Sequence, residues 1–289
     1  MKKFLALLLA LMMSLSLVAC GGNDAAEEEA PADDTAVEDT AVEETPESDA
    51  AYIEGNGKVV VGITIYEPMN YYDEAGNLTG FDTEFALAVC DKLGLEAEFQ
   101  EINWDTKEIE LAGKTIDCIW NGMTITADRA ANMSISLPYV KNAQVIVVKA
   151  DSAYASTADL VDATLVAEMG SAGEAQIEGE DANADLAQAE YVGMNKQTDC
   201  LMEVKAGTAD AAVLDWTLAK SMVGEGTDFA DLKMIEGVEL ATEEYGIAFR
   251  QGSYFTAKVD DAIKALVADG TLPALAEKYG LALAPAIAG

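Results

Sequence analysis

The sequence predicts an α/β protein made of two lobes with a ligand cleft between them, and three observations support this prediction. Short apolar strands alternate with helical segments, a pattern typical of a sheet with helices on its faces. The alternation stops at Pro138-Tyr139 and then begins again, so the chain contains two such units. Key strands end in polar or Gly-rich loops, and ligands bind at the carboxyl ends of strands in sheets of this kind.

The first 19 residues predict a targeting segment. Lys2 and Lys3 precede an uncharged run over 4–19, which is short for a membrane span of roughly 20 apolar residues. The run ends in Leu-Val-Ala-Cys-Gly at 17–21, which resembles the lipobox of bacterial lipoproteins. We therefore expect lipidation of Cys20, which would anchor the protein without spanning the membrane. The alternative is an ordinary signal peptide with an incidental Cys.

Residues 20–49 are expected to form a disordered acidic tether. From residue 23 the segment is rich in Asp, Glu, Ala, Thr and Pro and contains no Lys or Arg. Such a composition buries too little apolar surface to offset the ordering entropy, and its like charges repel. An acidic binding tail is the alternative. The remaining length, from about 50 to 289, suits two modest lobes or one larger domain.

Composition excludes several classes of function. The formal net charge is −35 and no basic patch is present, so nucleic acid is not an expected partner. The chain has no His, which removes Ser-His-Asp and Cys-His catalysis and every His-based metal site. No Walker A motif occurs, and we expect no cofactor. Apart from Cys20, the cysteines are Cys90, Cys118 and Cys200, which we expect to be buried free thiols.

The first unit is predicted from strand-forming runs and helix signals. Phe81, Phe85, Val89 and Leu93 lie on one helical stripe, and Gly94 ends that helix. Asp105 is expected to cap a short helix, with Glu108 at the capping-box spacing. In order, the predicted elements are a strand at 59–65, a turn at 73–77, a helix from 81, a strand at 96–102, a short helix from 105 to 113 and a buried strand at 116–120.

The second unit is predicted in the same way, and its buried strand 211–214 stops at Asp215. The predicted strands are 144–149, 164–167, 191–192 and 211–214, with an extended apolar segment at 238–249. The predicted helices start at 156 and after 173, and further helices cover 197–206, 259–268 and 274–279.

The loop after the strand 116–120 has the residues of a carboxylate-binding site. Gly122 removes a side chain, so that another molecule can approach the backbone. Thr126 is a plausible N-cap, and Thr124 adds a second hydroxyl. Arg129 offers a bidentate fork near free N–H groups of a helix start. The alternative is a surface turn with a solvated Arg.

At this point the ordered set of motifs resembles the extracellular solute-binding proteins of polar amino-acid ABC importers, from about 59 to 281. The first-unit motifs are Tyr66-x-Pro68, Gly80-Phe81-Asp82, Trp104-Asp105, Gly113-x-x-x-Asp117, the loop from Gly122 to Arg129, and Ser136-x-Pro138-Tyr139. Those of the second half are Asp159-Leu160, Gly170-Ser171, Gly207-x-x-Asp210-Ala211, Asp215, Tyr245-Gly246-Ile247-Ala248, Asp269-Gly270-Thr271 and Lys278-Tyr279-Gly280.

This resemblance implies a two-lobe, type II periplasmic-binding-protein-like fold whose lobes join through two crossings. Lobe one would comprise 50–143 and 244–289, and lobe two would comprise 144–243. The family implies a polar L-amino acid as ligand, hinge closure around it, and delivery to a membrane permease driven by a separate ATPase. It also implies an extracytoplasmic protein, which we expect to be lipid-anchored and monomeric.

The resemblance also assigns site residues. Arg129 would clamp the ligand α-carboxylate, helped by Thr124 and by the backbone at Gly122 and Ala172, while Asp215 would accept the α-ammonium. The aromatic walls would be Tyr66 and Trp104, and Asn121 and Glu168 would face the ligand side chain. Some members carry an acid at the position of Ile63, so their specificity cannot be copied.

Each assignment has an alternative interpretation. Tyr66 and Trp104 could be ordinary core aromatics, Asp215 could cap the following helix, and Glu168 could be an exposed loop acid. At the level of function, the alternatives are a dehydratase-like cleft enzyme with Glu168 or Asp215 as general acid, and a sensor lobe. We expect no catalysis, because the set already fits recognition of a zwitterion.

Overall fold

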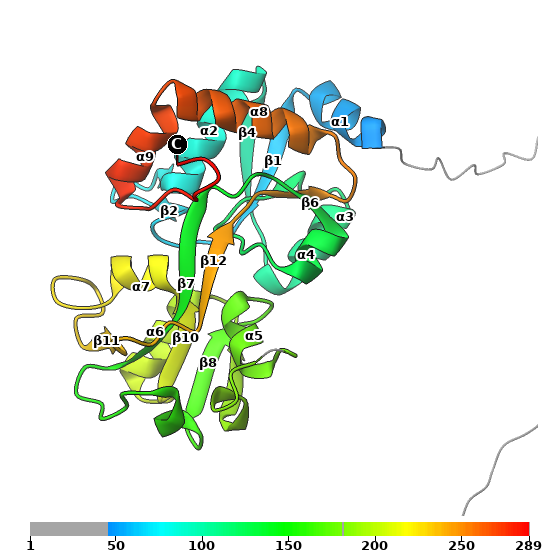
Figure 1. The fold of residues 1–289 in the computed structure, drawn as a ribbon. Helices are drawn as coiled ribbons and strands as arrows, with labels where there is room; N and C mark the ends of the chain where they lie inside the picture. The colour runs from blue at the N-terminus through cyan, green and yellow to red at the C-terminus, as the bar shows by residue number, and fades with distance from the viewer. Residues whose placement is uncertain (1–45, 181, 289) are drawn as a thin grey trace, which may run out of the picture. The chain divides into compact units, whose positions relative to one another are not determined.

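The structure is a computed structural model that describes residues 46–180 and 182–288 (Figure 1). The predicted signal segment, Cys20 and the expected tether up to residue 45 lie outside this range. Helix α1 (Pro46–Gly55) begins inside the segment 20–49 that was expected to be a disordered tether. The last four residues of that segment, 46–49, are therefore helical. The buried side chains of Ala50 and Ile53 supply apolar contact that the acidic composition further upstream does not predict.

Lobe one is built on a five-stranded mixed sheet with the order β4-β1-β5-β13-β6. The parallel pairs are β1 with β4 and β1 with β5, and β13 runs antiparallel to both β5 and β6. Helices α2, α8 and α9 pack against one another beside this sheet (Figure 1). The elements are β1 (Lys58–Ile63), β2 (Tyr71–Tyr72), β3 (Leu78–Thr79), α2 (Phe81–Leu93), β4 (Glu96–Glu101), α3 (Lys107–Ala112), β5 (Cys118–Ile119), α4 (Ala127–Asn132), β6 (Met133–Ile135), β13 (Ala248–Arg250), α8 (Phe255–Ala268) and α9 (Thr271–Tyr279).

Lobe two is built on a second sheet with the order β11-β7-β10-β8-β9, and β12 pairs with β7. Strands β8, β9 and β10 run parallel, so their carboxyl ends share one edge. Glu168 is the last residue of β8 and Asp215 the last of β10, which places both acids at that edge. The elements are β7 (Val140–Lys149), β8 (Thr164–Glu168), α5 (Ala172–Glu178), β9 (Glu190–Met194), α6 (Gln197–Ala206), β10 (Ala211–Asp215), α7 (Trp216–Met222), β11 (Leu232–Met234) and β12 (Ala241–Tyr245), with short 3-10 turns at Thr157–Leu160 and Leu186–Gln188.

The two crossings between the lobes are strands β7 and β12, which pair with each other in antiparallel register (Figure 1). Asn142 lies opposite Glu243, and Gln144 lies opposite Ala241. The expected crossing points, 143–144 and 243–244, fall inside these paired strands. The hinge is therefore a hydrogen-bonded two-stranded ribbon.

Local signals explain most element ends. Gly94 follows α2 with a φ of 69° and its N–H closes the last turn, as expected from the Gly after an apolar stripe. Thr126 caps α4 by accepting a hydrogen bond from the Arg129 N–H. The expected Asp105 cap is wrong: Asn103 accepts from the Asp105 N–H and starts a 3-10 turn (Trp104–Thr106) that leads into α3. Asn is an equally good cap, and it precedes the turn by one residue.

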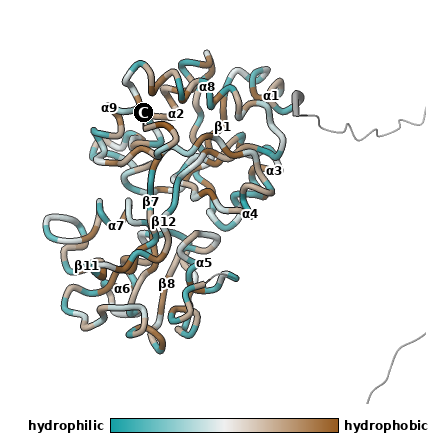
Figure 2. The backbone as a smooth tube through the Cα atoms, viewed as in Figure 1, coloured by the Kyte–Doolittle hydropathy of each residue, from teal (hydrophilic) through white to brown (hydrophobic). Residues whose placement is uncertain are grey.

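Apolar strands form the interior of both sheets, as the hydropathy colouring of Figure 2 shows for β8. Cys90, Cys118 and Cys200 are buried and unpaired, which confirms the expectation of free thiols. Burial raises the pKa of the Cys90 thiol to about 12, so this thiol stays protonated. Within the described ranges, every helix is too short or too polar to cross a bilayer.

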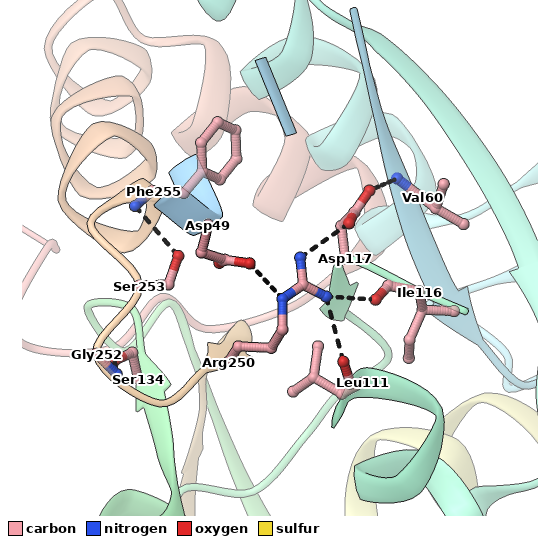
Figure 3. Close-up of polar contacts among 10 residues, drawn as sticks. All are labelled: Asp49, Val60, Leu111, Ile116, Asp117, Ser134, Arg250, Gly252, Ser253 and Phe255. Carbon is pink, nitrogen blue, oxygen red and sulfur yellow. Dashed lines mark hydrogen bonds and ion pairs between the residues drawn. The ribbon is translucent and has the colours of Figure 1, made fainter. Parts of the chain in front are cut away.

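Helix α1 is attached to lobe one by the guanidinium of Arg250, which lies between two carboxylates (Figure 3). Arg250 pairs with Asp49 of α1 and with Asp117, whose Oδ1 lies 2.9 Å from Nη2. The same side chain donates to the carbonyls of Leu111 and Ile116, at 3.2 and 2.8 Å. Only 10% of the Arg250 side chain is exposed, so this ion-pair cluster is largely desolvated.

Candidate functional site

One cavity collects all nine residues predicted for the site. It lies where the carboxyl ends of the lobe-two strands meet the loop after β5, and its volume is about 10 Å³, room for a single water molecule. Two residues not predicted, Ser171 and Gln197, also line it. The complete lining is Tyr66, Trp104, Asn121, Gly122, Thr124, Arg129, Glu168, Ser171, Ala172, Gln197 and Asp215.

Arg129 is a buried cation on α4 that donates to backbone carbonyls. Nη1 donates to the Thr124 carbonyl at 2.8 Å, and Nη2 donates across the cleft to the Gly170 carbonyl at 3.0 Å. Within residues 46–180 and 182–288, no carboxylate forms an ion pair with Arg129. Burial lowers the pKa of Arg129, although a guanidinium remains charged in proteins. A desolvated cation without a paired carboxylate is suited to bind an anion.

The other donors of the loop are arranged differently from what the sequence predicts. The Gly122 N–H donates to Asp82 at 2.7 Å, and the Thr124 hydroxyl donates to Glu243 at 2.9 Å. The Thr126 hydroxyl is used as the cap of α4. Buried polar groups find partners within the fold, so Gly122 and Thr124 already donate to carboxylates, whereas the Arg129 fork has no anionic partner among the described residues.

Gly122 is required by side chains of the same chain. Its φ is +58°, and a Cβ there would lie 2.6 Å from Cε1 of Tyr66 and 3.1 Å from Cε2 of Tyr245. The sequence predicts that another molecule approaches this backbone; instead, the two tyrosine rings occupy the space. Gly122 therefore seats the aromatic wall of the cavity.

Asn121 reaches the cavity, but its amide is engaged within lobe one. Its Nδ2 donates to the Thr64 carbonyl at 2.9 Å and to Asn70 at 2.6 Å, and its Oδ1 accepts from the Thr64 hydroxyl at 2.6 Å. These bonds fix the loop after β5 against the loop after β1. The amide has one acceptor lone pair left, so the geometry supports a structural role more than recognition of a ligand side chain.

Of the two predicted aromatic walls, Tyr66 reaches across the cleft, and Trp104 packs against Lys107 of its own lobe. The Tyr66 hydroxyl bonds to Thr217 of α7 and, at 2.6 Å, to the Tyr245 hydroxyl. Trp104 lies under the ammonium of Lys107, with 4.9 Å between Nζ and the ring centroid. Lys107 also donates to the Gly170 carbonyl at 2.9 Å, the acceptor that Arg129 uses. Both aromatics are buried, and both line the cavity as well as contributing to the core.

Asp215 does not cap the helix that follows it. It occupies the N-cap position of α7 without a capping bond from its side chain. Instead its carboxylate accepts from Gln197, from Asn142 and, at 2.8 Å, from Gln144. Burial raises the pKa of Asp215, and the hydrogen bonds from the three amides oppose that effect. The carboxylate is thus fixed by neutral donors, which leaves its charge available to a cation.

Glu168 is buried and faces the cavity, which is contrary to its interpretation as an exposed loop acid. Burial and, next, the charge of Asp215 raise the pKa of Glu168 to about 8. Lys107 acts in the opposite direction. Burial and, next, the charge of Arg129 lower the pKa of Lys107 to about 8. The side-chain end of the cavity therefore holds a carboxyl that a cationic group would ionise.

The loop from Gly170 to Ala172 closes the lobe-two side. The Ser171 hydroxyl caps α5 by accepting from the Glu174 N–H at 3.1 Å, and the Gly170 N–H donates to the Glu174 carboxylate at 2.7 Å. No described residue accepts a hydrogen bond from the Ala172 N–H, the first of the helix. Ala172 lines the cavity that Arg129 enters.

Glu243 is a polar residue beside the site that was not predicted from the sequence. It lies on β12, is buried, and accepts from Thr124, Asn142 and Gln144. A signal was present: Asn142 and Gln144 place two amides at alternate, buried positions of a largely apolar strand. Amides at alternate positions of a buried strand need partners on that face, and Glu243 and Asp215 provide them.

Comparisons with known proteins give matches to one family. A sequence profile of bacterial extracellular solute-binding proteins, family 3, matches residues 59–282. The arginine-binding extracellular protein ArtP of Bacillus subtilis is 28% identical over 282 residues, which cover 96% of this chain and 98% of ArtP. The structure of holo ArgBP from T. maritima has a TM-score of 0.68 and 32% identity, covering 79% of this chain and 98% of that one. An ABC uptake transporter substrate-binding protein from Streptococcus pneumoniae with bound histidine has a TM-score of 0.71 and 28% identity, covering 80% and 95%.

Proposed function

Because this chain belongs to the bacterial extracellular solute-binding proteins of family 3, we propose that its cleft captures a polar L-amino acid for an ABC importer. The permease and its ATPase would be separate chains. The relatives named above are binding proteins for amino acids, which supports capture and release over the dehydratase-like alternative.

The charge layout of the cavity carries this proposal. Arg129 supplies one buried cation on the lobe-one side, and Asp215 and Glu168 supply carboxyl groups at two strand ends of lobe two. A zwitterion places a carboxylate and an ammonium a few ångströms apart, and this layout offers one partner to each. Glu168 then faces whatever the ligand carries as its side chain.

We infer a ligand with a hydrogen-bond-donating side chain, basic or amide. A desolvated carboxyl is costly unless a donor or a cation pairs with it, and an acidic ligand would add like-charge repulsion at Glu168. Arginine and histidine, which relatives of this chain are named for or bind, are of this kind. A small neutral ligand is expected only if Glu168 takes no part in recognition.

Capture requires the lobes to separate and close again. The cavity volume of about 10 Å³ does not admit an amino acid, so entry needs movement about β7 and β12. Arg129 and Lys107, both of lobe one, bond to Gly170 of lobe two, and these contacts must break for opening. We infer that a ligand touching both lobes favours the closed arrangement by its differential affinity.

A thermal-shift screen tests the proposed function. The panel is the proteinogenic amino acids with ornithine, citrulline and cystine, since a ligand that binds only the folded state raises the melting temperature. Calorimetry then ranks those that shift it. If none of the panel shifts the melting temperature, the proposed function is wrong; conversion of a ligand during the assay would favour the enzyme.

The substitution Glu168→Gln is expected to reduce the preference for basic ligands. With the carboxyl replaced by an amide, arginine and lysine should lose affinity relative to glutamine, because the cation loses its ionisable partner. Competition calorimetry measures the ranking, and Glu190→Gln, an exposed acid on β9, is the matched control. An unchanged ranking would show that Glu168 is not the selector. Tighter binding of aspartate or glutamate than of arginine would contradict the inferred ligand class.

The substitution Asp215→Asn is expected to weaken ligands that have an α-ammonium far more than their desamino analogues. The amide oxygen can still accept from Gln144, so the fold is retained, but the charge that faces the ammonium is lost. Calorimetry with arginine and with its desamino analogue compares the two losses in one protein. Equal losses would make Asp215 a structural residue.

The membrane attachment belongs to the same proposal. A lipid anchor at Cys20 and an acidic spacer would hold a monomer outside the cytoplasmic membrane, within reach of the permease. Mass spectrometry of the mature N-terminus tests this point, because a lipidated Cys20 differs in mass from an unmodified one. A mature chain that begins elsewhere would remove the anchor and leave the cleft proposal intact.

A further inference from the structure

Two carboxyl groups and two amides form a cluster where the hinge ribbon meets the end of β10. Asn142 and Gln144 on β7 each donate to Oε2 of Glu243, at 3.1 and 3.0 Å, and each also donates to Oδ1 of Asp215. Each amide has two N–H donors, so both are fully used by this bridging. All four side chains are buried. The cluster thus joins Glu243 of the hinge to the acid that is proposed to receive the ligand ammonium.

Oε2 of Glu243 and Oδ1 of Asp215 accept hydrogen bonds from the same two amide nitrogens. Two ionised carboxylates in these positions would therefore repel each other. When two buried carboxyl groups accept from the same donors, the state with one proton on the pair is favoured over the state with two charges. Asp215 is better supported as the ionised member, since amides bond to both of its oxygens. Glu243 receives all its hydrogen bonds on a single oxygen, Oε2.

Thr124 links this cluster to the carboxylate end of the cavity. Its hydroxyl has one proton, which it donates to Glu243 at 2.9 Å. That proton cannot also reach a ligand carboxylate beside Arg129. A protonated Glu243 can donate to Thr124 instead, and the Thr124 proton is then free to point into the cavity.

We propose that Glu243 is a positioning residue of the binding site: it holds the proton shared with Asp215 and thereby turns the Thr124 hydroxyl toward the ligand carboxylate. This inference rests on the proposed function. The hinge then contributes to ligand recognition as well as to lobe movement. With the proton on Glu243, Asp215 stays charged for the ligand ammonium, and the Thr124 hydroxyl is free to donate to the ligand carboxylate. No bond other than O–H and hydrogen bonds changes.

The surroundings of Glu243 agree with a protonated state near neutral pH. Among the described residues, the charge of Asp215 at the end of β10 acts most strongly on Glu243, and Arg129 on α4 also interacts with it. Lys141 of β7 and Glu244 of β12 line a surface cavity together with Glu243, while the β7 side chains that hydrogen-bond to it are two uncharged amides. Burial and, next, the charge of Asp215 raise the pKa of Glu243 to about 7. Since the bound form prefers the protonated carboxyl, affinity contributed by Glu243 is present below pH 7 and is lost as the pH rises through that value.

The experiment compares Glu243→Gln with the wild-type protein by calorimetry with L-arginine and L-glutamine from pH 6 to pH 8.5. The amide introduced by this substitution offers a donor at every pH, whereas the Glu243 carboxyl loses its proton as the pH rises. The affinity of the variant relative to the wild type should therefore increase with pH. The increase is about tenfold if ligand binding shifts the pKa of Glu243 by one unit. Other titrating groups are common to both proteins and largely cancel in the ratio of dissociation constants. Glu244→Gln, the neighbouring and half-buried acid on β12, is the matched control with the same charge change. In a Thr124→Val background the pH dependence of the ratio should disappear.

A ratio that is constant with pH, or one that changes equally in Glu244→Gln, would overturn the inference. A second measurement needs no ligand: ¹³C NMR titration of the Glu243 carboxyl, whose signal is assigned by its absence from the Glu243→Gln spectrum. We expect a midpoint near pH 7, and an ionised carboxylate throughout the range from 5.5 to 8.5 would also overturn the inference. If neither amino acid binds, the proposed function fails for these ligands, and the NMR titration still decides the state of Glu243.

Discussion

Replacing Arg129 with Ala is expected to abolish measurable amino-acid binding and to leave the protein folded. The guanidinium is the one cation that lines the described cavity, and it has no carboxylate partner among the described residues. Without it a ligand carboxylate would be buried with no cation. The expected cost is about 2–5 kcal/mol, or roughly 30-fold to several thousand-fold in affinity.

Calorimetry measures this loss, and thermal melting followed by circular dichroism checks the fold. Arg129→Lys is the informative companion, because it keeps the charge and loses the fork that bonds to Thr124 and to Gly170. We expect intermediate affinity for that variant. Near-normal affinity in a folded Arg129→Ala protein would exclude Arg129 as the carboxylate clamp.

Replacing Arg250 with Met is expected to destabilise the fold by about 3–5 kcal/mol. The substitution leaves the carboxylates of Asp49 and Asp117 in a largely buried place without their cation (Figure 3). It also removes the donor that bonds to the Leu111 and Ile116 carbonyls at the end of α3 and before β5. Urea unfolding gives the change in the free energy of unfolding.

The control for Arg250 is Lys258→Met, which removes an exposed ion pair between α8 and Glu54 of α1. Exposed ion pairs contribute little, so we expect almost no change in that variant. The destabilisation caused by Asp49→Asn should lie between those of Arg250→Met and Lys258→Met, because Asp117 keeps its ion pair with Arg250. Equal effects of Arg250→Met and Lys258→Met would mean that burial does not strengthen the Arg250 cluster.

The fold was predictable from sequence where one local signal decides the structure. The stripe from Phe81 to Leu93 followed by Gly94 predicts α2, and the bounds of α6 agree with the predicted 197–206. Thr126 was correctly predicted as a cap. The start of α1 was not predictable in this way, since its acidic sequence is stabilised by packing and by the distant Arg250 rather than by its own composition.

The site was predictable as a set of residues but not as a set of bonds. Motif order identified Arg129, Asp215 and Glu168, and the structure brings them to one cavity. Motif order says nothing of which donors the fold itself consumes, so the occupied N–H of Gly122 and the occupied hydroxyl of Thr124 were missed. Their acceptors, Asp82 and Glu243, lie 40 and 119 residues away in sequence.

The attachment of α1 has a mechanical consequence. The chain enters the described structure through α1, which is clasped to lobe one by the Asp49–Arg250 ion pair. A force applied to the chain before α1 therefore acts on lobe one and is not transmitted across the cleft to lobe two. If the protein is tethered to a surface, lobe one acts as the fixed body and lobe two as the part that swings. Drag or stretching of the tether would then leave the opening angle, and with it the affinity, unchanged.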